Sequence, residues 1–379
     1  MQPINQGFSL SLKHAFKYIA IFAIAAFSCD INEPDWDRSI GSVSVFEMYL
    51  RQDKWLELEA SRDPNKFYTG KVFFEGDDDK AEIAAYNYKG NVSVIPNYKF
   101  DLGNPDINDN NMYELKTKLN PEYLFEISLA TYLYGIANIL NSEFEYVFLK
   151  INDEDKGIYL LTEDVNKYAF EKNDVELYEL FHIPENVKFD YSIGQSDKIR
   201  NIYSSEGKSL KQSIEELLQV IDTISAENVE QLADYIDIKE YLRFKAVSIV
   251  LGYDTNKNYY LYKDSANAPF KIMPGEYGYS DIVENHNRLF DNDKLIALLM
   301  ESEKYFEYYM QYLSKLLNTY INENIIAGMT RNIKQRLEEV YKASPYNVQG
   351  SDGLNSAAER FEAKIFERKE LLLKIMGVS

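Results

Sequence analysis

The stretch Glu145-Tyr-Val-Phe-Leu-Lys-Ile-Asn-Asp-Glu-Asp-Lys-Gly-Ile-Tyr-Leu-Leu-Thr-Glu163 decides the fold of this chain. Its first seven residues are rich in β-branched and aromatic side chains, which predicts a strand over Glu145–Ile151. Asn152–Gly157 predicts a turn, because Asn, Asp and Gly tolerate the backbone angles that turns require. Ile158–Leu161 predicts the returning strand, so the stretch forms a β-hairpin.

A helix is predicted directly before this hairpin. Asn120 and Pro121 form a helix-start signal, with Asn as the cap and Pro in the first turn. Apolar residues then recur at helical spacing, which places them on one face: Leu124, Ile127, Leu129, Leu133, Ile136 and Ile139. The helix and the hairpin together form a predicted unit over residues 119–170.

The part before this unit reads mostly as strands. Residues 42–118 contain alternating apolar segments separated by Gly- and Asp-rich turns, with a short helix predicted around Glu47–Glu59. After the unit, residues 171–207 are irregular and charged. Helical patterns then resume and a second hairpin follows: Leu210–Ile224, Val229–Tyr235 and Ile238–Leu251 as helices, Tyr259–Tyr262 and Phe270–Met273 as strands.

Residues 281–379 predict a helical C-terminal region, broken around Gly350–Gly353. Its last helix carries apolar residues on one side and is expected to dock on the body. The fold class is therefore predicted to be α+β, with a β-rich N-terminal lobe, embedded hairpins and a helical C-terminal region.

Composition excludes several classes of function. The apolar share of 45% is that of an ordinary globular protein. The net charge of −20 repels phosphate backbones and argues against a nucleic-acid partner. One cysteine and three histidines argue against an intrachain disulfide and a structural zinc site. Neither a P-loop nor a Gly-x-Ser-x-Gly elbow is present.

Residues 1–28 resemble a bacterial lipoprotein signal peptide. A short basic region precedes the apolar run Tyr18–Ser28, which is too short for a membrane core of roughly 30 Å. Cleavage before Cys29, the only cysteine, would expose it for lipidation, although Phe27 stands where a small residue is usual. Residues 29–41 then predict a solvated tether. We expect a lipid-anchored protein of the bacterial cell envelope, periplasmic or surface-exposed; the alternative is an incidental buried thiol.

Four separated segments match short patterns of one family. The hairpin fits a pattern like Leu-x-x-Asn-Gly-x-x-x-Gly-x-Tyr-x-Leu-x-Glu at Asn152, Gly157, Tyr159, Leu161 and Glu163. Residues 253–262 occupy the place of Asn-x-Asp-x-x-x-x-Asn-Tyr-x-Leu-Tyr, with the loop between Asp254 and Asn258 one residue shorter than in the pattern. Residues 272–278 occupy the place of a Pro-Trp-Asp-x-Asp segment, and Gly90-Asn91-x-Ser93 with Pro96 fits Gly-Asn-x-Ser. The four segments occur in the same order as in the CotH kinase-like family (spore coat protein CotH-like), and residues 89–280 therefore resemble that family. A family core is therefore predicted over residues 42–280.

The resemblance implies an atypical protein-kinase fold that transfers the γ-phosphoryl group of ATP to serine. It implies Asp254 as the catalytic residue that orients the hydroxyl group. It also implies Asn258 and Glu276 as ligands of Mg²⁺ or Mn²⁺, and Glu163 and Lys99 as nucleotide-binding residues. Without the resemblance, Asp254 and Asn258 would be read as turn caps and Glu163 as a partner of a lysine or a cap.

Several positions depart from the family pattern. Glu276 and Gly278 stand in place of the two Asp residues, and Gly275 replaces the Trp. The Lys expected after Ser-x-x-Pro is Asn97, with Lys99 as a shifted candidate, and the family's Arg near residue 125 is lost. The site is therefore either degenerate or rebuilt.

Three functions remain open at this point. A degenerate kinase-fold scaffold or binding protein at the envelope, with an unknown protein partner, is favoured because ATP is scarce outside the cytoplasm. The alternative is an active, ATP- and Mg²⁺-dependent protein serine kinase with an unknown protein substrate. A weaker alternative is a carbohydrate-binding lipoprotein, suggested by the 31 tyrosines and the aromatic run Tyr305–Tyr312.

Overall fold

The computed structural model of the 379-residue chain describes residues 43–74, 77–86, 95–102, 112–117, 120–184, 187, 195–205, 211–252, 258–275, 288–290, 293–345 and 351–378. The chain divides into two compact units. Unit 1 comprises Met1–Asn120, Glu143–Asp164 and Lys334–Leu354; unit 2 comprises Pro121–Ser142, Val165–Ile333 and Asn355–Ser379.

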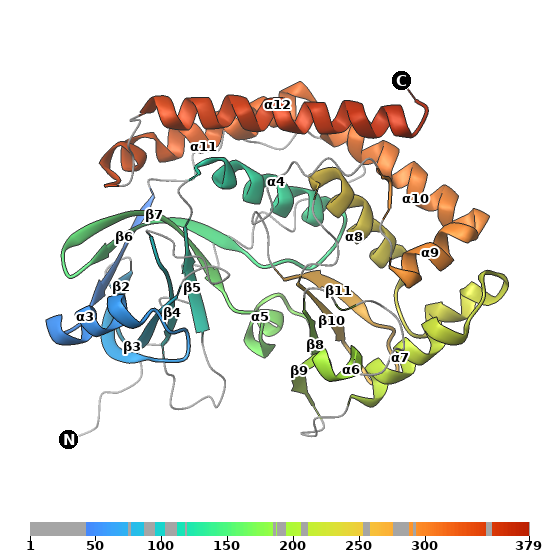
Figure 1. The fold of residues 1–379 in the computed structure, drawn as a ribbon, viewed down its shortest axis with the longest axis horizontal. Helices are drawn as coiled ribbons and strands as arrows, with labels where there is room; N and C mark the ends of the chain where they lie inside the picture. Colours follow the sequence, from blue (N-terminus) through green and yellow to red (C-terminus); the bar gives the residue numbers. More distant parts are fainter. Residues whose placement is uncertain are drawn as a thin grey trace, which may run out of the picture. The chain divides into compact units, whose positions relative to one another are not determined.

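Unit 1 is built on a closed barrel of strands in the order β1-β2-β3-β4-β5-β7-β6 (Figure 1). All paired strands are antiparallel except β1 and β6, which pair in parallel and close the barrel. The strands are β1 (Ser44–Tyr49), β2 (Tyr68–Phe74), β3 (Asp77–Tyr86), β4 (Asn97–Asp101), β5 (Met112–Lys116), β6 (Phe144–Ile151) and β7 (Glu154–Glu163). Helix α3 (Gln52–Ser61) connects β1 to β2, where the sequence predicts a short helix.

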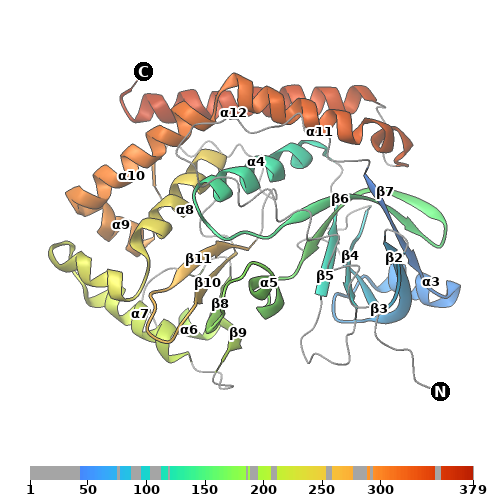
Figure 2. The same ribbon diagram turned by 180° about the vertical axis from the view of Figure 1, so that it is seen from behind.

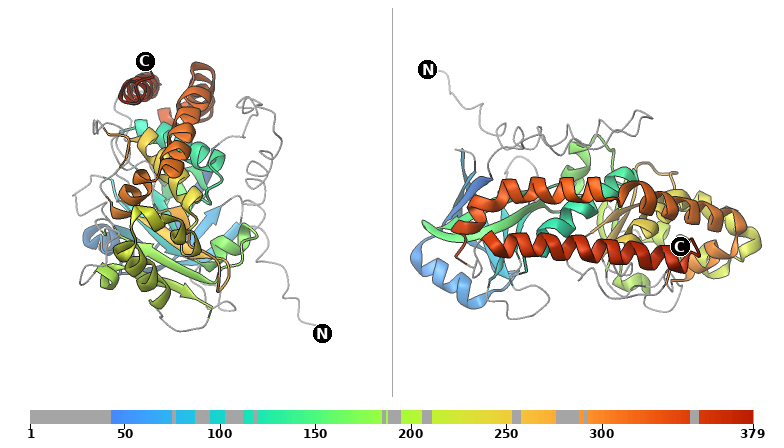
Figure 3. Two further views of the ribbon diagram at one scale, coloured as in Figure 1. Left: turned by 90° about the vertical axis from the view of Figure 1, so that its right-hand side faces the viewer. Right: turned by 90° about the horizontal axis from the view of Figure 1, so that it is seen from above.

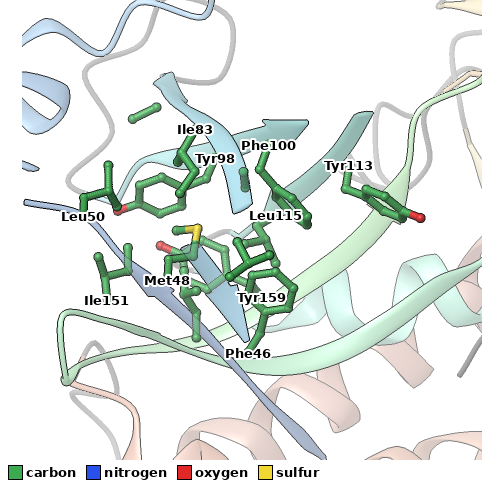
Figure 4. Packing of buried hydrophobic residues seen from close by; sticks show 14 of the residues in the cluster. Phe46, Met48, Leu50, Ile83, Tyr98, Phe100, Tyr113, Leu115, Ile151 and Tyr159 are labelled. Carbon is green, nitrogen blue, oxygen red and sulfur yellow. The ribbon is translucent and has the colours of Figure 1, made fainter. Parts of the chain in front are cut away.

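Alternate side chains of these strands fill the interior of the barrel (Figure 4). Tyr98 and Phe100 of β4, Leu115 of β5 and Tyr159 of β7 are each 1% exposed or less. The Phe100 ring lies 5.1 Å from that of Phe46, centroid to centroid. The interior is therefore a packed core, and the residues between these core positions face outward.

The predicted hairpin is formed by β6 and β7. Asn152 and Asp153 both have positive φ angles, 50° and 66°, as a two-residue hairpin turn requires. The side chain of Asn152 also accepts a hydrogen bond of 2.9 Å from the backbone N–H of Leu50, which fixes the turn. The predicted turn over Asn152–Gly157 is thus too long, because β7 begins at Glu154.

Unit 2 contains a four-stranded antiparallel sheet in the order β11-β10-β8-β9. Strands β10 (Tyr259–Lys263) and β11 (Lys271–Pro274) form the predicted second hairpin. The prediction that residues 171–207 are irregular is wrong, because they contain β8 (Glu179–Ile183), the short helix α6 (Gln195–Lys198) and β9 (Arg200–Ser204). The short helix α5 (Lys167–Lys172) ends at the start of this range. All five residues of β8 are buried, so β8 lacks the alternation that marks a half-buried strand.

Helices make up the rest of unit 2 as described, largely where the sequence predicts them. They are α4 (Glu122–Ile136), α7 (Gln212–Thr223), the 3₁₀ helix η2 (Ala226–Asp234), α8 (Ile238–Leu251), α9 (Lys294–Glu301), α10 (Glu303–Lys315) and the π-helical turn η3 (Leu316–Tyr320). Helices α11 (Glu323–Ala343) and α12 (Ser351–Ile375) have residues in both units. Helix α8 is buried along most of its length and packs against α4, α10 and β11 (Figure 2).

The C-terminal helix docks on the body, as predicted. In Figure 3, α12 is drawn in dark red as one unbroken helix. Within unit 2, its Phe361 ring stacks on Phe125 of α4 at 5.8 Å between centroids. Glu122, buried at the start of α4, pairs with both Arg360 and Lys364 of α12. These contacts hold the two helices together.

A charged pair lies in the interior of unit 2. Lys245 of α8 and Asp293 are 2.7 Å apart, with side chains 2% and 1% exposed. Asp293 also accepts hydrogen bonds from the Tyr241 hydroxyl and from the backbone N–H of Ile296, so it caps α9. Both oxygens of the buried carboxylate therefore have hydrogen-bond partners, which offsets the cost of burying the charge.

The architecture confirms the predicted α+β class, with strands concentrated in the first part of the chain and helices in the last. Among the described residues, no helix combines the length and the apolar character needed to cross a bilayer.

Candidate functional site

Three charged side chains gather on the outer face of the barrel in unit 1. Lys99 of β4 lies opposite Glu114 of β5 in the strand register, and its Nζ is 3.0 Å from Glu114 Oε1. Lys116, two residues along β5 and therefore on the same face, pairs with Glu114 Oε2. The three side chains are 28%, 15% and 14% exposed in chain order. We call this group the Lys99–Glu114–Lys116 cluster.

The charge state of the cluster follows from the environment of Glu114. Burial alone would raise the pKa of this carboxyl, but the charges of Lys116 and Lys99 and their hydrogen bonds outweigh burial and lower the pKa to about 2. Glu114 is therefore ionised at neutral pH. Within this cluster two ammonium groups share one carboxylate, and ammonium groups are donors of the kind that bind phosphate oxygens.

Asn97 has a structural task on this same face. It lies two residues before Lys99, is 2% exposed, and its Oδ1 accepts a 2.9 Å hydrogen bond from the backbone N–H of Thr117. It thereby ties β4 to the end of β5. The resemblance implies a lysine at position 97, where Asn97 instead stabilises the sheet. Lys99 places a positive charge two residues further along β4, on the same face.

Glu163 does not join the cluster. It is the last residue of β7 and lies opposite Tyr113, whose ring belongs to the interior core. Glu114 instead lies opposite Thr162. Since residues directly opposite each other share a face, the register places Glu163 on the other face of the sheet from Lys99 and Glu114. The chain enters unit 2 at Val165, two residues after Glu163.

Asn258 lies immediately before β10 in unit 2. Its backbone oxygen accepts a 3.0 Å hydrogen bond from the N–H of Gly275, just after β11. A Cβ atom on Gly275 would lie 2.7 Å from that oxygen, closer than real Cβ contacts come. Glycine at 275, where the family pattern has Trp, therefore permits the close approach of the two strand ends.

The side chain of Asn258 hydrogen-bonds His182 of β8, a residue that the sequence reading did not single out. His182 is 8% exposed, and its Nδ1 lies 2.8 Å from Nη2 and 3.2 Å from Nε of Arg200 on β9. Burial, and then the charge of Arg200, lower the pKa of His182 to about 4, so the ring is neutral at pH 7.

Asp254, Glu276 and Cys29 lie outside the described residues, so their predicted roles remain predictions. Within the described part of the chain, no group of three His, Cys, Asp or Glu side chains could hold a metal ion. The amide oxygen of Asn258 is nevertheless a hard donor of the kind that Mg²⁺ and Mn²⁺ accept. It fits the predicted divalent cation, with Asp254 and Glu276 as its predicted companions.

The aromatic run on α10 contributes mainly to the core. Tyr305 and Tyr309 are 4% and 0% exposed, whereas Tyr308 and Tyr312 are half-buried. The Tyr308 hydroxyl accepts a 3.3 Å hydrogen bond from Arg243. This burial makes the run part of a core face rather than an exposed sugar-stacking platform.

Comparison with known proteins agrees with the sequence patterns. The family model described as CotH kinase protein matches residues 109–370, well over half of the chain. The inner spore coat protein H of Bacillus subtilis (strain 168) is 22% identical over 253 residues, which cover 60% of this chain and 69% of that protein.

Solved structures give a weaker likeness. A Golgi casein kinase matches with a TM-score of 0.33 and 10% identity, over 100% of this chain and 93% of that one. The proinflammatory kinase CtkA of Helicobacter pylori matches with a TM-score of 0.28 and 12% identity, over 78% and 96%. At these TM-scores the likeness carries no structural argument, and the assignment rests on the family match. By that match, the chain belongs to the CotH kinase protein family.

Proposed function

We propose that this chain is a lipid-anchored protein of the bacterial cell envelope that binds ATP with a divalent cation and works as a binding scaffold rather than as a fast kinase. The Lys99–Glu114–Lys116 cluster is the observation that carries the binding half of the proposal. The proposal that the chain is not a fast kinase is supported by Glu276 and Gly278, which stand in place of the family's two Asp residues. The two halves make different predictions and are tested separately.

The cluster supplies the cations that phosphate binding requires. In protein kinases, a lysine that pairs with a glutamate holds ATP phosphates. Here Glu114 holds two lysines at once, and its low pKa keeps the carboxylate ionised. Lys116 thus offers a second positive charge in a chain that lacks the family's arginine near residue 125. In this proposal, Lys116 replaces the missing arginine in the phosphate-binding part of the site.

Transfer of the phosphoryl group places stricter demands on the metal ligands. Negative charge that develops on the transferring oxygens must be neutralised by groups already in place. Glu276 keeps a carboxylate but adds a methylene group, and Gly278 supplies no ligand. The loss of one preorganised electrostatic group costs about 3–4 kcal/mol of transition-state stabilisation, or 10²–10³ in rate. Binding is expected to survive this loss better than catalysis.

The residues have the following proposed roles. Lys99 and Lys116 would hold phosphate oxygens, and the amide oxygen of Asn258 would bind the divalent cation together with the carboxylates of Asp254 and Glu276. When bound, the cation would neutralise phosphate charge. Asp254 would accept a hydrogen bond from a serine hydroxyl of a partner and orient it.

The test measures binding and transfer on the same preparation. Isothermal titration calorimetry with Mn²⁺ and ATP is expected to show binding, while incubation with γ-labelled ATP and serine-containing protein is expected to show little or no transfer. Turnover of about 1–100 per second, the range of working kinases, would contradict the scaffold. Absence of nucleotide binding with either metal would overturn the binding half.

An active CotH-type kinase is the second candidate, because the sequence keeps Asp254 and Asn258 at the implied catalytic and metal positions. It predicts transfer that Asp254→Ala abolishes. The scaffold predicts a partner, captured by cross-linking in the envelope, whose binding survives the same substitution. The two candidates therefore differ in whether the wild type transfers phosphate and whether Asp254→Ala abolishes that transfer.

Envelope anchoring is tested independently of the nucleotide. Cells fed an alkyne fatty acid are expected to label the wild-type protein, and Cys29→Ala is expected to abolish both the label and recovery in the membrane fraction. Labelling that persists in Cys29→Ala would overturn the lipid anchor.

A further inference from the structure

Two cations of α8 and two tyrosines of α10 lie together in unit 2. Lys239 and Arg243 are four residues apart on α8, and Tyr308 and Tyr312 are four residues apart on α10, so each pair shares one face of its helix. Helices α8 and α10 pack against each other (Figure 2). We call these four side chains the Arg243–Tyr308 surface.

Direct contacts join the four side chains. The ammonium nitrogen of Lys239 lies 5.7 Å from the centroid of the Tyr308 ring, within the range of a cation–π interaction. Arg243 donates a 3.3 Å hydrogen bond from Nη1 to the Tyr308 hydroxyl. The rings of Tyr308 and Tyr312 lie 6.4 Å apart between centroids and are nearly parallel, at 12°. Tyr308 therefore contacts both cations and the second tyrosine.

Neither cation is neutralised by an acid. Within the described ranges, Lys239 and Arg243 form no ion pair. Arg243 is half-buried, and its Nε donates a 2.7 Å hydrogen bond to the carbonyl of Ala137 at the end of α4, which fixes the guanidinium group. The charge of Arg243 acts on Glu240, but that carboxyl is buried and accepts from the Ile272 N–H instead.

The absence of an acid here contrasts with other lysines of unit 2. With 61 acidic residues against 41 basic ones, a cation of this chain readily finds an acid. Three lysines of the unit do so: Lys271 with Asp264, Lys294 with Asp222, and Lys304 with Glu230. Two neighbouring cations that face tyrosines instead mark a place for an anion that the described part of the chain does not supply.

Tyr312 adds an unsatisfied donor to this place. Its hydroxyl is buried and has no hydrogen-bond partner among the described residues. Buried polar groups are normally hydrogen-bonded, so an acceptor that entered beside Arg243 would remove this deficit. Tyrosine and arginine are also the residue types that contribute most often to the binding energy of protein interfaces.

We infer that the Arg243–Tyr308 surface binds an acidic segment of a protein partner, with an Asp or Glu carboxylate held by Arg243 and Lys239 and with neighbouring groups packed on the two tyrosine rings. A carboxylate accepts charge-assisted hydrogen bonds from guanidinium and ammonium groups. The inference rests on the proposed function in one respect, because a binding scaffold needs a partner. It requires no nucleotide, and none of the four residues belongs to the Lys99–Glu114–Lys116 cluster.

Screening explains how a chain of net charge −20 can hold an acidic segment. At physiological ionic strength, charges are screened over about 8 Å. Distant carboxylates of the chain therefore repel the segment weakly, whereas its contacts with Lys239 and Arg243 persist.

The first experiment selects binders of the full chain from a displayed library of random peptides of about 12 residues, in about 0.15 M salt. We expect the selected peptides to be enriched in Asp and Glu. The best peptide, and a copy with Gln for Glu and Asn for Asp, are then titrated by fluorescence anisotropy. The copy should bind at least about tenfold more weakly, as the loss of charged hydrogen bonds implies.

Charge reversal at two exposed lysines of unit 2 locates the binding site. Lys239→Glu places an acid in the first turn of α8, which the helix dipole favours, so the fold should be kept. Lys198→Glu makes the same change of charge on α6. We expect Lys239→Glu to weaken the selected peptide about tenfold or more and Lys198→Glu to stay within about twofold of wild type. Arg243→Gln should behave like Lys239→Glu, with its melting temperature recorded because Arg243 also binds Ala137.

Three results would overturn the inference: selected peptides with no acidic enrichment, a Lys239→Glu variant that binds the peptide as wild type does, or an equal loss in Lys198→Glu. Each would leave the proposed nucleotide binding untouched. Fast phosphoryl transfer by the wild type, or no binding of ATP with Mn²⁺, would instead count against the proposed function, and the peptide titrations would still decide whether this surface binds acidic segments.

Discussion

Lys99 of β4 and Glu114 of β5 face each other on the outside of the barrel, with 3.0 Å between Nζ and Oε1, and Lys116 binds the other oxygen of the same carboxylate. A residue that is 15% exposed and paired with two lysines is held in one place and in one charge state. The consequences of this relationship for stability and for binding can be measured separately.

Replacement of Glu114 by Gln should destabilise unit 1 in a pH-dependent way. The native pKa of about 2 lies below the ordinary value of 4.5, so the unfolded carboxyl binds protons first as the pH falls. The stabilisation is therefore complete above about pH 4.5 and is lost towards pH 2. We expect Glu114→Gln to lose up to about 3 kcal/mol at pH 7. Urea denaturation between pH 7 and pH 3 should show the gap between variant and wild type closing; a constant gap would contradict this.

Glu240 of α8 should show the opposite pH dependence. Burial raises the pKa of this carboxyl from 4.5 to about 7, although it accepts a 2.8 Å hydrogen bond from the Ile272 N–H. Between these values the native state binds more protons than the unfolded state, so stability falls as the pH rises from about 4.5 to about 7. Glu240→Gln keeps the acceptor and removes the ionisation. We expect it to equal wild type near pH 4.5 and to be more stable, by up to about 3 kcal/mol, at pH 8.

The buried pair in unit 2 should be far more sensitive than an exposed one. Asp293→Ala strands the ammonium group of Lys245 and removes the cap of α9, so we expect a loss of about 3–5 kcal/mol. Asp222→Ala is the matched control, because Asp222 pairs with Lys294 at the surface, with side chains 44% and 36% exposed. That change should cost less than about 1 kcal/mol. Equal losses by thermal denaturation would show that the interior pair is not desolvated.

Gly275→Ala tests whether the approach of Gly275 to Asn258 matters. The new methyl group would meet the Asn258 oxygen at 2.7 Å and push the two strand ends apart. We expect lower thermal stability and weaker Mn²⁺ binding. Gly135→Ala in α4 is the control: nothing lies within 4 Å of its Cβ, and alanine favours helix, so stability should hold or rise by about 0.5–1 kcal/mol. Gly275→Ala with unchanged Mn²⁺ affinity would contradict the role assigned to this contact.

The sequence predicted those helices and strands whose apolar spacing and turn or cap residues lie within one short segment. The hairpin β6–β7 and helices α4, α8 and α12 follow from spacing and from turn or cap residues. Strand β8 was missed because it is buried throughout and therefore shows no alternation, and β9 because it becomes a strand only by pairing with β8. The excess length predicted for the hairpin turn arose from polar residues at the exposed start of β7.

Some residues of the candidate site could be predicted from the sequence, and others were found only from the fold. The family pattern led to Lys99 and Asn258, because motif residues keep their order in the sequence. Glu114 and Lys116 joined the cluster only through strand pairing, although alternation within Met112-Tyr-Glu-Leu-Lys116 does put both on one face. His182 left one local signal, a lone histidine in the apolar run Leu180-Phe-His-Ile183. Its partners Arg200 and Asn258 lie far along the chain and could not be deduced from it.

The measurement that tests the central claim most directly is the affinity of the full chain for ATP with Mn²⁺, by titration calorimetry, in wild type, Lys99→Ala, Lys116→Ala and Lys71→Ala. Lys71 lies on β2 of the same unit, is exposed, and serves as the control for a lost surface charge. We predict that Lys99→Ala and Lys116→Ala each weaken binding at least about tenfold, as the loss of a charged hydrogen bond implies, and that Lys71→Ala leaves it within about twofold. Equal affinities in all four proteins, or no binding by wild type, would contradict the claim.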